Sequence, residues 1–295
     1  LDRVKLDGVP YDSRFTAPDP YTNYAAYYMP GGVIEGVPNR TVTAEPHSEY
    51  RGWGTSGTID WELADGVTLK SITAYRKFHS EWIGDVDGSP LGLGLDFQDI
   101  DNEQFSQEVR LSGKLAGGAL EYTVGGYYLH RWAAYRPRQY FIYQSPSYDY
   151  VNDDRIKNDS LAGFANLAWH VTDAFNLIGG VRYTHEKKSF ALRRYTQTGE
   201  TVSGYEVLNT LTSRYSKGTW DWSISADYKL TPDVMAYGSI ATGYRSGGNT
   251  PRPFAPDQAL PFGPESTVNY EIGLKNTLFD RRLRLNLAAF YSTLN

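Results

Sequence analysis

Cations and aromatic rings are concentrated in one segment of the sequence, where Arg131, Arg136 and Arg138 lie close to several tyrosines. A guanidinium donates charge-assisted hydrogen bonds to an anion, and a tyrosine ring stacks on a flat ligand or on a cation. This pattern predicts a binding site for an anionic, aromatic ligand. The candidate ligand-binding residues are Arg131, Arg136, Arg138, Tyr140 and Tyr143. In a membrane-spanning β-barrel, the same residue types also form an aromatic girdle and a basic rim that contacts lipopolysaccharide phosphates. Both interpretations stay open.

Other possible sites are weaker. Lys187, Lys188, Arg193 and Arg194 form a basic run that we interpret as the solvated base of a loop. A second stretch is rich in carboxylates, but its spacing does not fit a calcium-binding loop, so we interpret it as a solvated acidic rim. It comprises Asp85, Asp87, Asp96, Asp99, Asp101 and Glu103.

Enzyme chemistry is not indicated. The five histidines lie on separate segments without the spacing of a zinc site, so no metal ligands are assigned. A serine-hydrolase elbow, a phosphate-binding loop and a dinucleotide fingerprint are missing in the strand-turn-helix context that they need. We therefore predict no catalytic residues, no metal and no cofactor.

Composition excludes several classes of protein. The 295 residues include no cysteine, which rules out a disulfide scaffold and thiolate chemistry. A net charge of −5 argues against nucleic acid as the main partner. No apolar run approaches the length of a transmembrane helix. Tyr outnumbers Phe by 24 to 12, which is typical of rings placed between water and an apolar medium.

Five short breaks recur along the chain at near-regular intervals, and each is flanked by apolar residues. They centre on Asp65, Gly117, Asp173, Pro232 and Asp280, where the local residues suit tight turns. The spacing predicts five hairpins. We expect ten strands, most of them twice the usual length, at about 51–62, 67–82, 101–113, 120–136, 157–171, 175–190, 216–230, 234–245, 266–279 and 282–294. Residues 1–6 are expected to be the outer end of a preceding strand.

Apolar and polar side chains alternate along these strands. Trp220, Trp222 and Ile224 share one predicted face, and Asp221 and Asp227 share the other. The connections at the other end are long and irregular, at roughly 83–100, 137–156, 191–215 and 246–265. Short turns at one end and long loops at the other favour a transmembrane, antiparallel, up-and-down β-barrel, with apolar faces toward lipid and polar faces toward an aqueous lumen. A soluble β-sandwich is the alternative.

The sequence from about residue 51 to 295 resembles the barrel region of TonB-dependent receptors. ATGYRSGGN and the strand VNYEIGLK carry the resemblance, and GGVRYTHEKK adds to it through Gly180, Arg182 and Tyr183. The family-motif residues are Gly243, Tyr244, Arg245, Gly247, Gly248, Pro264, Glu265, Tyr270, Glu271, Gly273, Leu274 and Lys275.

The resemblance implies a Gram-negative outer-membrane protein that imports a scarce nutrient, most often a ferric siderophore. Family members have a barrel of about 22 strands that is filled by an N-terminal plug. Residues 1–295 would then be a partial barrel domain of about ten strands that lacks the plug. The implied partners are outer-membrane lipid and lipopolysaccharide, a ferric siderophore or similar ligand, and the TonB complex through the missing plug, but not nucleic acid. The alternatives are a passive porin, another large outer-membrane barrel, or a soluble all-β protein that binds carbohydrate or has a structural role.

Overall fold

The computed structural model describes the chain except for residues 1, 8–46, 86–93, 142–147, 251–252 and 254. Its main feature is one 14-stranded sheet, in which neighbouring strands along the main path pair antiparallel. The path consists of β1 (Asp2–Asp7), β2 (His47–Ala64), β3 (Val67–Asp85), β4 (Gly94–Leu115), β5 (Leu120–Tyr135), β8 (Asp154–His170), β9 (Phe175–Ala191), β11 (Thr212–Thr231), β12 (Val234–Arg245), β15 (Glu265–Leu278) and β16 (Leu283–Leu294).

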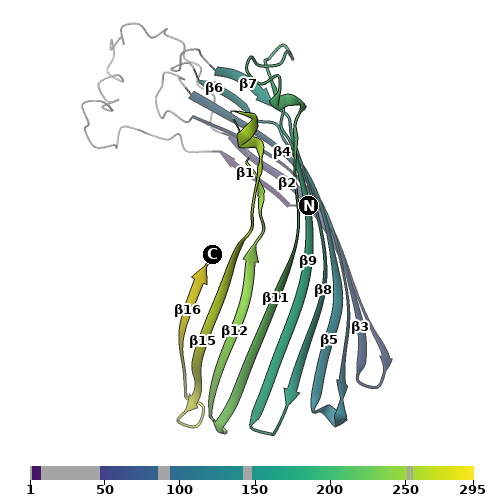
Figure 1. Ribbon diagram of the computed structural model, residues 1–295, viewed down its shortest axis with the longest axis vertical. Helices are drawn as coiled ribbons and strands as arrows, with labels where there is room; N and C mark the ends of the chain where they lie inside the picture. The colour runs from purple at the N-terminus through teal and green to yellow at the C-terminus, as the bar shows by residue number, and fades with distance from the viewer. Residues whose placement is uncertain (1, 8–46, 86–93, 142–147, 251–252, 254) are drawn as a thin grey trace, which may run out of the picture.

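These strands confirm the predicted up-and-down architecture, because each one lies beside the strand that precedes it along the path (Figure 1). All ten predicted strands are present, and β1 pairs with the outer end of β2, as expected for residues 1–6. The sheet curls into an arc and does not close into a ring, since β1 and β16 lie at its two edges. No helix formed by the described residues is long and apolar enough to span a membrane.

Five tight turns join the strands at the lower end of the arc in Figure 1, where the sequence predicts them. Between β2 and β3, Gly66 adopts a φ of 71°, which glycine reaches without steric cost. Between β8 and β9, the Thr172 hydroxyl accepts the backbone N–H groups of Ala174 and Phe175 at 3.2 and 3.0 Å. Short connections of this kind hold consecutive strands in antiparallel register.

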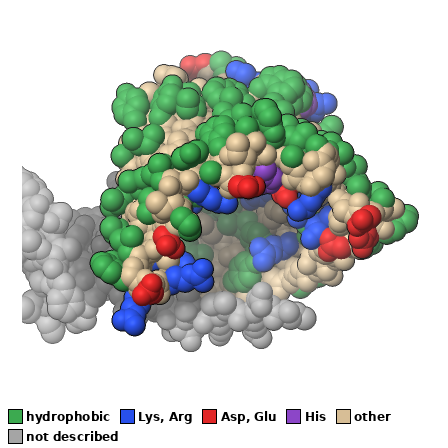
Figure 2. Space-filling model, turned by 90° about the horizontal axis from the view of Figure 1, so that it is seen from below, with side chains coloured by type: hydrophobic (Ala, Val, Ile, Leu, Met, Phe, Trp, Pro, Cys, Tyr) green, Lys and Arg blue, Asp and Glu red, His purple; other side chains and the backbone are tan. Residues whose placement is uncertain are grey.

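The two faces of the arc differ in chemistry, as the alternation predicts. Trp220, Trp222 and Ile224 are 65, 42 and 53% exposed on the outer face. Asp227, on the opposite face, accepts a hydrogen bond from Nδ2 of Asn176 at 2.8 Å. Apolar side chains form the rim of the arc, whereas charged side chains line its hollow (Figure 2). We therefore call the convex face the lipid face and the concave face the inner wall.

Aromatic rings border the apolar band of the lipid face. Phe175 and Tyr228 lie near the tight turns, with ring centroids 6.4 Å apart. Three further pairs lie toward the opposite end, which we call the outer end: Trp53 with Tyr75 at 5.2 Å, Phe105 with Tyr128 at 6.4 Å, and Tyr183 with Trp220 at 4.8 Å. Two such girdles mark the interfaces of a membrane-spanning barrel.

The long connections contain more structure than the irregular loops that the sequence predicts. Three short strands, β6 (Arg138–Phe141), β7 (Tyr148–Asn152) and β10 (Arg194–Tyr195), extend the sheet beyond the ends of β5, β8 and β9. Pro137 has no N–H to donate, so the ladder is interrupted there, and its carbonyl instead accepts the N–H of Asn152 at 2.9 Å. The connections also contain η4 (Leu208–Thr210), η5 (Pro256–Ala259) and the strand pair β13 (Gly248–Asn249) and β14 (Pro261–Phe262).

A small core lies beneath the connection that follows β10. Phe190, Leu192, Tyr205 and Leu208 are buried together. Beside them, Nη1 of Arg194 lies 2.6 Å from Oδ1 of Asp154, and both side chains are almost fully buried.

This ion pair corrects the interpretation of the basic run as one solvated loop base. Arg194 is buried, and the Arg193 guanidinium donates to the backbone oxygens of Leu192 and Leu211. Lys188 points to the inner wall, while its neighbour Lys187 is exposed on the lipid face. A sequence run therefore does not define one environment, because strand alternation and the break between β9 and β10 separate its members.

The two faces predict opposite tolerance to charge. In the full-length protein, Ile224→Arg is expected to destabilise the folded barrel in a bilayer by about 2–4 kcal/mol, because it places a guanidinium in hydrocarbon. Ser225→Arg, one position along on the inner wall, should have little effect. The folded fraction in lipid vesicles, read as the heat-modifiable band on a gel, measures both. Equal effects of the two substitutions would contradict the assignment of faces.

The short strands β6, β7 and β10 and the connection over Leu208 form what we call the outer cap. Breaking the buried ion pair should loosen this cap. Arg194→Leu leaves the Asp154 carboxylate buried without its cation, a change that costs about 3–5 kcal/mol in comparable sites. We expect faster protease cleavage within residues 192–211 on intact cells that carry the full-length protein. Arg214→Leu removes an exposed cation nearby and serves as the control. Unchanged cleavage in Arg194→Leu would show that the pair does not hold the cap.

Candidate functional site

The inner wall carries the polar groups that could meet a solute in the lumen. Arg182 on β9 lies over the rings of Tyr127 and Phe164, 5.7 Å from each centroid. Lower on the wall, Lys70 pairs with Asp60 at 2.9 Å. Cross-strand contacts of this kind make the wall a hydrated, mixed-charge surface with aromatic platforms.

The structure separates the residues of the predicted ring-plus-cation site. Arg138 and Tyr140 come together on β6, where the Arg138 guanidinium lies 5.7 Å from the Phe97 ring and 6.0 Å from the Tyr140 ring. The same guanidinium donates two hydrogen bonds to Asp149, at 3.0 and 3.1 Å, and these bonds raise the pKa of Arg138 above its ordinary value. Its charge is thus already neutralised by a carboxylate.

Arg136 and Arg131 lie in two further environments. Arg136, between β5 and β6, pairs with the carboxylates of Asp99 and Asp101. Arg131 lies on the inner wall and donates through Nε and Nη2 to the side-chain oxygen of Asn102, at 2.8 and 3.1 Å. Tyr143 lies outside the described residues. The assignment of these five residues to a ligand site stays a prediction.

Four of the carboxylates that we interpreted as a solvated acidic rim lie on strand β4, namely Asp96, Asp99, Asp101 and Glu103. Asp99 and Asp101 approach His79 of β3 closely enough for the three side chains to share a cation. The Arg136 guanidinium already pairs with both carboxylates, so we assign no metal to this cluster. Asp96 is only 8% exposed, contrary to the prediction of a solvated side chain. The side chains of Asp85 and Asp87 lie outside the described residues.

The family-motif residues form a seam between β12 and β15. The Tyr237 hydroxyl donates to Oε1 of Glu271 at 2.6 Å, and Nζ of Lys275 lies 5.1 Å from the Tyr237 ring. The Tyr237 ring covers Gly273 so closely that a Cβ there would lie 2.5 Å from the ring. At the outer end of the seam, Arg245 pairs with Glu265 at 3.7 Å.

A second part of the motif is attached to the inner wall. Nζ of Lys188 donates to Oγ of Ser246 at 2.7 Å and to the backbone oxygen of Gly247 at 2.8 Å. The N–H of Gly247 donates to the Tyr215 hydroxyl at 3.3 Å. Gly248 belongs to β13, which pairs with β14 shortly before Pro264. Tyr244 lies close to Thr184 and to the carboxylates of Glu186 and Asp221.

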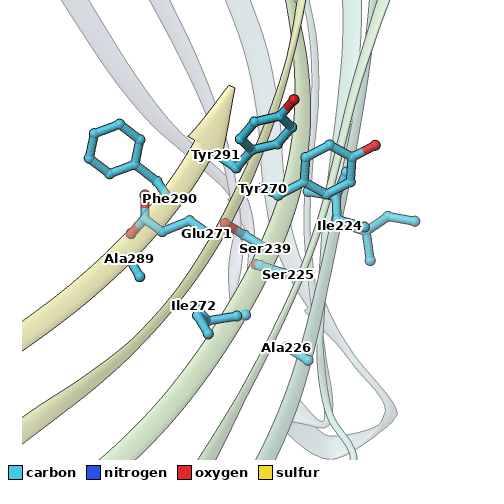
Figure 3. Close-up of a pocket in the computed structure, with 12 residues that line it drawn as sticks. Ile224, Ser225, Ala226, Ser239, Tyr270, Glu271, Ile272, Ala289, Phe290 and Tyr291 are labelled. Atoms are coloured by element: carbon cyan, nitrogen blue, oxygen red, sulfur yellow. The ribbon is translucent and has the colours of Figure 1, made fainter. Parts of the chain in front are cut away.

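A groove of about 630 Å³ crosses β11, β12, β15 and β16 on the apolar side. Ile224, Tyr270 and Tyr291 stand along it on three strands (Figure 3). Tyr270, a motif residue, therefore belongs to the lipid face, together with Leu274 of the same seam. We assign this groove to the membrane-facing surface and the polar chemistry to the inner wall.

The sequence prediction did not name Arg76 or Gln104 of the inner wall, and it assigned Lys188 to the solvated base of a loop. Their signal is the period of two alone: each stands next in sequence to a residue of the lipid face, namely Tyr75, Phe105 and Lys187. Because the three residues lie on different strands far apart in sequence, only the register brings them together.

Comparisons with known proteins agree with this architecture. Residues 2–295 match the family model described as TonB dependent receptor-like, beta-barrel. The pesticin receptors of Yersinia enterocolitica and Yersinia pestis are each 32% identical over 151 residues, which is 51% of this chain and 21% of each relative. The chain thus spans about a fifth of the length of these curated relatives.

Solved structures show the same fold. The ferric yersiniabactin uptake receptor FyuA of Yersinia pestis superposes with a TM-score of 0.72 at 22% identity, over 85% of this chain and 37% of that one. The ferric-catecholate import receptor Fiu of E. coli K12 superposes with a TM-score of 0.65 at 16% identity, over 99% and 47%. At this identity the likeness establishes fold alone.

The seam predicts a steric requirement at Gly273. Gly273→Val places a branched side chain against the Tyr237 ring of β12, and its Cβ lies 2.7 Å from the Leu287 carbonyl oxygen of β16. Strand β15 therefore cannot keep its present packing against both β12 and β16. We expect a lower yield of folded, heat-modifiable full-length receptor. Gly163→Val is the matched control, because nothing lies within 4 Å of a Cβ at that position. Equal yields of the two variants would contradict the proposed packing.

Proposed function

This chain belongs to the TonB-dependent receptor family, which lies in the outer membrane of Gram-negative bacteria, and we propose that it is part of an importer for a ferric siderophore. The observation that carries the proposal is the pairing of an apolar lipid face with a polar, aromatic-bearing inner wall along the whole arc. Such a wall surrounds a hydrated path for a bulky solute and excludes lipid from it.

The similarity to named receptors supports the nature of the cargo. The matched pesticin receptors and the ferric yersiniabactin and ferric-catecholate receptors share the family or the fold. We propose that residues 1–295 contribute one part of a larger barrel domain, and that transport by the parent protein is driven by the TonB complex. A passive porin would share the wall but would not require that energy.

We also propose that lipopolysaccharide contacts the outer part of the lipid face. Just beyond the outer girdle, Nζ of Lys77 pairs across strands with Glu103 at 2.6 Å, and the His130 ring lies 2.7 Å from the Asp159 carboxylate. Phosphates and their bridging cations in lipid headgroups are suited to a band of both signs.

Uptake by cells tests the importer proposal. Gram-negative cells that express the full-length receptor should accumulate radiolabelled iron from a ferric siderophore under iron limitation, and accumulation should stop when the TonB complex is removed. Cells without the receptor are the control. Uptake that continues without the TonB complex would identify a passive porin, and no uptake of any ferric chelate would refute iron import.

A further inference from the structure

One level of the inner wall carries three cations on alternate strands. The register of β3, β4, β5, β8 and β9 places these side chains in one cross-strand row, which runs Arg76, Gln104, Arg131, Asn158 and Lys188. Two strand spacings separate neighbouring cations, about 10 Å. Amide side chains fill the positions between them. The row therefore presents positive charge and neutral hydrogen-bonding groups in alternation.

Among the described residues, no member of this row forms an ion pair. Arg131 donates only to the amide oxygen of Asn102. Lys188 donates to a hydroxyl and a backbone oxygen and lies 5.6 Å from the Tyr215 ring centroid. The Arg131 guanidinium and the Lys188 ammonium are thus oriented by neutral partners and are not neutralised by them. Arg131 has five N–H groups and Lys188 has three, so both keep donors for a further acceptor.

Cations elsewhere at the outer end behave differently. Arg51 pairs with Glu49 at 2.7 Å, Arg138 with Asp149 at 3.0 Å, and Arg155 with Asp153 at 2.8 Å. Carboxylates are therefore abundant at this end, yet none within the described residues neutralises the row. The nearest acid along β9, Glu186, lies one level lower and faces Tyr244. Within the part of the chain that the structure describes, the row is thus a level of the inner wall where three cations stand without a paired carboxylate.

The row runs from the middle of β3 and β4 to the outer ends of β5, β8 and β9. Arg76 and Gln104 are the sequence neighbours of Tyr75 and Phe105, which belong to the outer girdle. Around these two residues the inner wall is hollowed by a depression of about 410 Å³, to which Tyr50 and the small residues Gly52 and Gly54 also contribute. Beyond this level β3 and β4 continue outward to Asp85 opposite Leu95, so a solute from outside passes that part of the wall before it reaches the row.

Aromatic rings flank the row at both ends. Tyr50 and Phe78 form a pair at one end, with ring centroids 5.3 Å apart, and Tyr215 lies beside Lys188 at the other. Rings of this kind stack on planar groups, while the cations donate charge-assisted hydrogen bonds to oxygen anions.

We propose that Arg76, Arg131 and Lys188 form an anion-binding row that selects a polyanionic iron chelate, with catecholate or carboxylate oxygens, over neutral chelates. This proposal rests on the proposed import function and specifies the charge of the cargo. A ligand with anionic groups about 10 Å apart would bridge two cations of the row.

Binding to the purified full-length receptor tests the row. The probes are a trianionic ferric tris-catecholate and a neutral ferric trihydroxamate, titrated against intrinsic fluorescence. Each of Arg76→Gln, Arg131→Gln and Lys188→Gln should weaken the binding of the anionic chelate about tenfold and leave the neutral chelate unaffected. Lys187→Gln, which removes the neighbouring cation from the lipid face, should change neither.

The outcomes separate this proposal from the proposed function. A receptor that binds no ferric chelate refutes iron import itself. Equal affinity for the neutral and the anionic chelate would overturn the proposed anion-binding row. Normal binding of the anionic chelate by the row variants would do the same. Neither result would contradict the proposed import function. Heat-modifiability confirms that each variant is folded. Arg131→Lys keeps the charge and should retain more affinity than Arg131→Gln, whereas equal losses would show that the arginine serves packing alone.

Discussion

The structure depends on one constraint: in hydrocarbon, every backbone N–H and C=O must find a partner within the protein. Long antiparallel strands meet this requirement by pairing along their whole length, as β3 and β4 do from Val67 with Gly113 to Asp85 with Leu95. Continuous pairing forbids helical or irregular backbone in the band and fixes a period of two. Every side chain is thereby assigned to lipid or to the lumen, so one sequence position separates Trp222, on the lipid face, from Asp221 on the inner wall.

That constraint explains what the sequence could reveal. Alternation and turn chemistry are local properties, so the ten strands and the turns at Asp65, Gly117 and Asp280 were predictable from neighbouring residues. The outer cap was not. Its strands are two to five residues long, and its stability comes from contacts such as Arg194 with Asp154, whose residues lie far apart in sequence. Charged side chains near a loop are usually exposed to solvent. Arg194 and Asp154 are buried instead, because the connection that contains Leu208 packs over them.

Register limited the prediction of the site in the same way. The local crowding of Arg131, Arg136 and Arg138 indicated one cluster, but alternation and the break at Pro137 send them to different surroundings. Arg136 and Arg138 meet acids, whereas Arg131 turns to the inner wall. Composition within a segment therefore reports which chemistry is present, while the pairing of strands decides which groups act together.

Pairing every backbone group in one sheet also makes the wall only one sheet thick, and this explains the motif glycines and the inner-wall cations. A wall one sheet thick has no buried core beneath it, so rings laid across glycine, such as Tyr237 over Gly273, supply packing that a core would otherwise provide. Charges on such a wall remain hydrated and cost little to leave unpaired, in contrast to the buried Arg194. Unpaired cations can therefore persist on the inner wall without a folding penalty, and their retention is decided by what the lumen must accommodate. On the lipid side, by contrast, Lys77 stands in a cross-strand pair with Glu103.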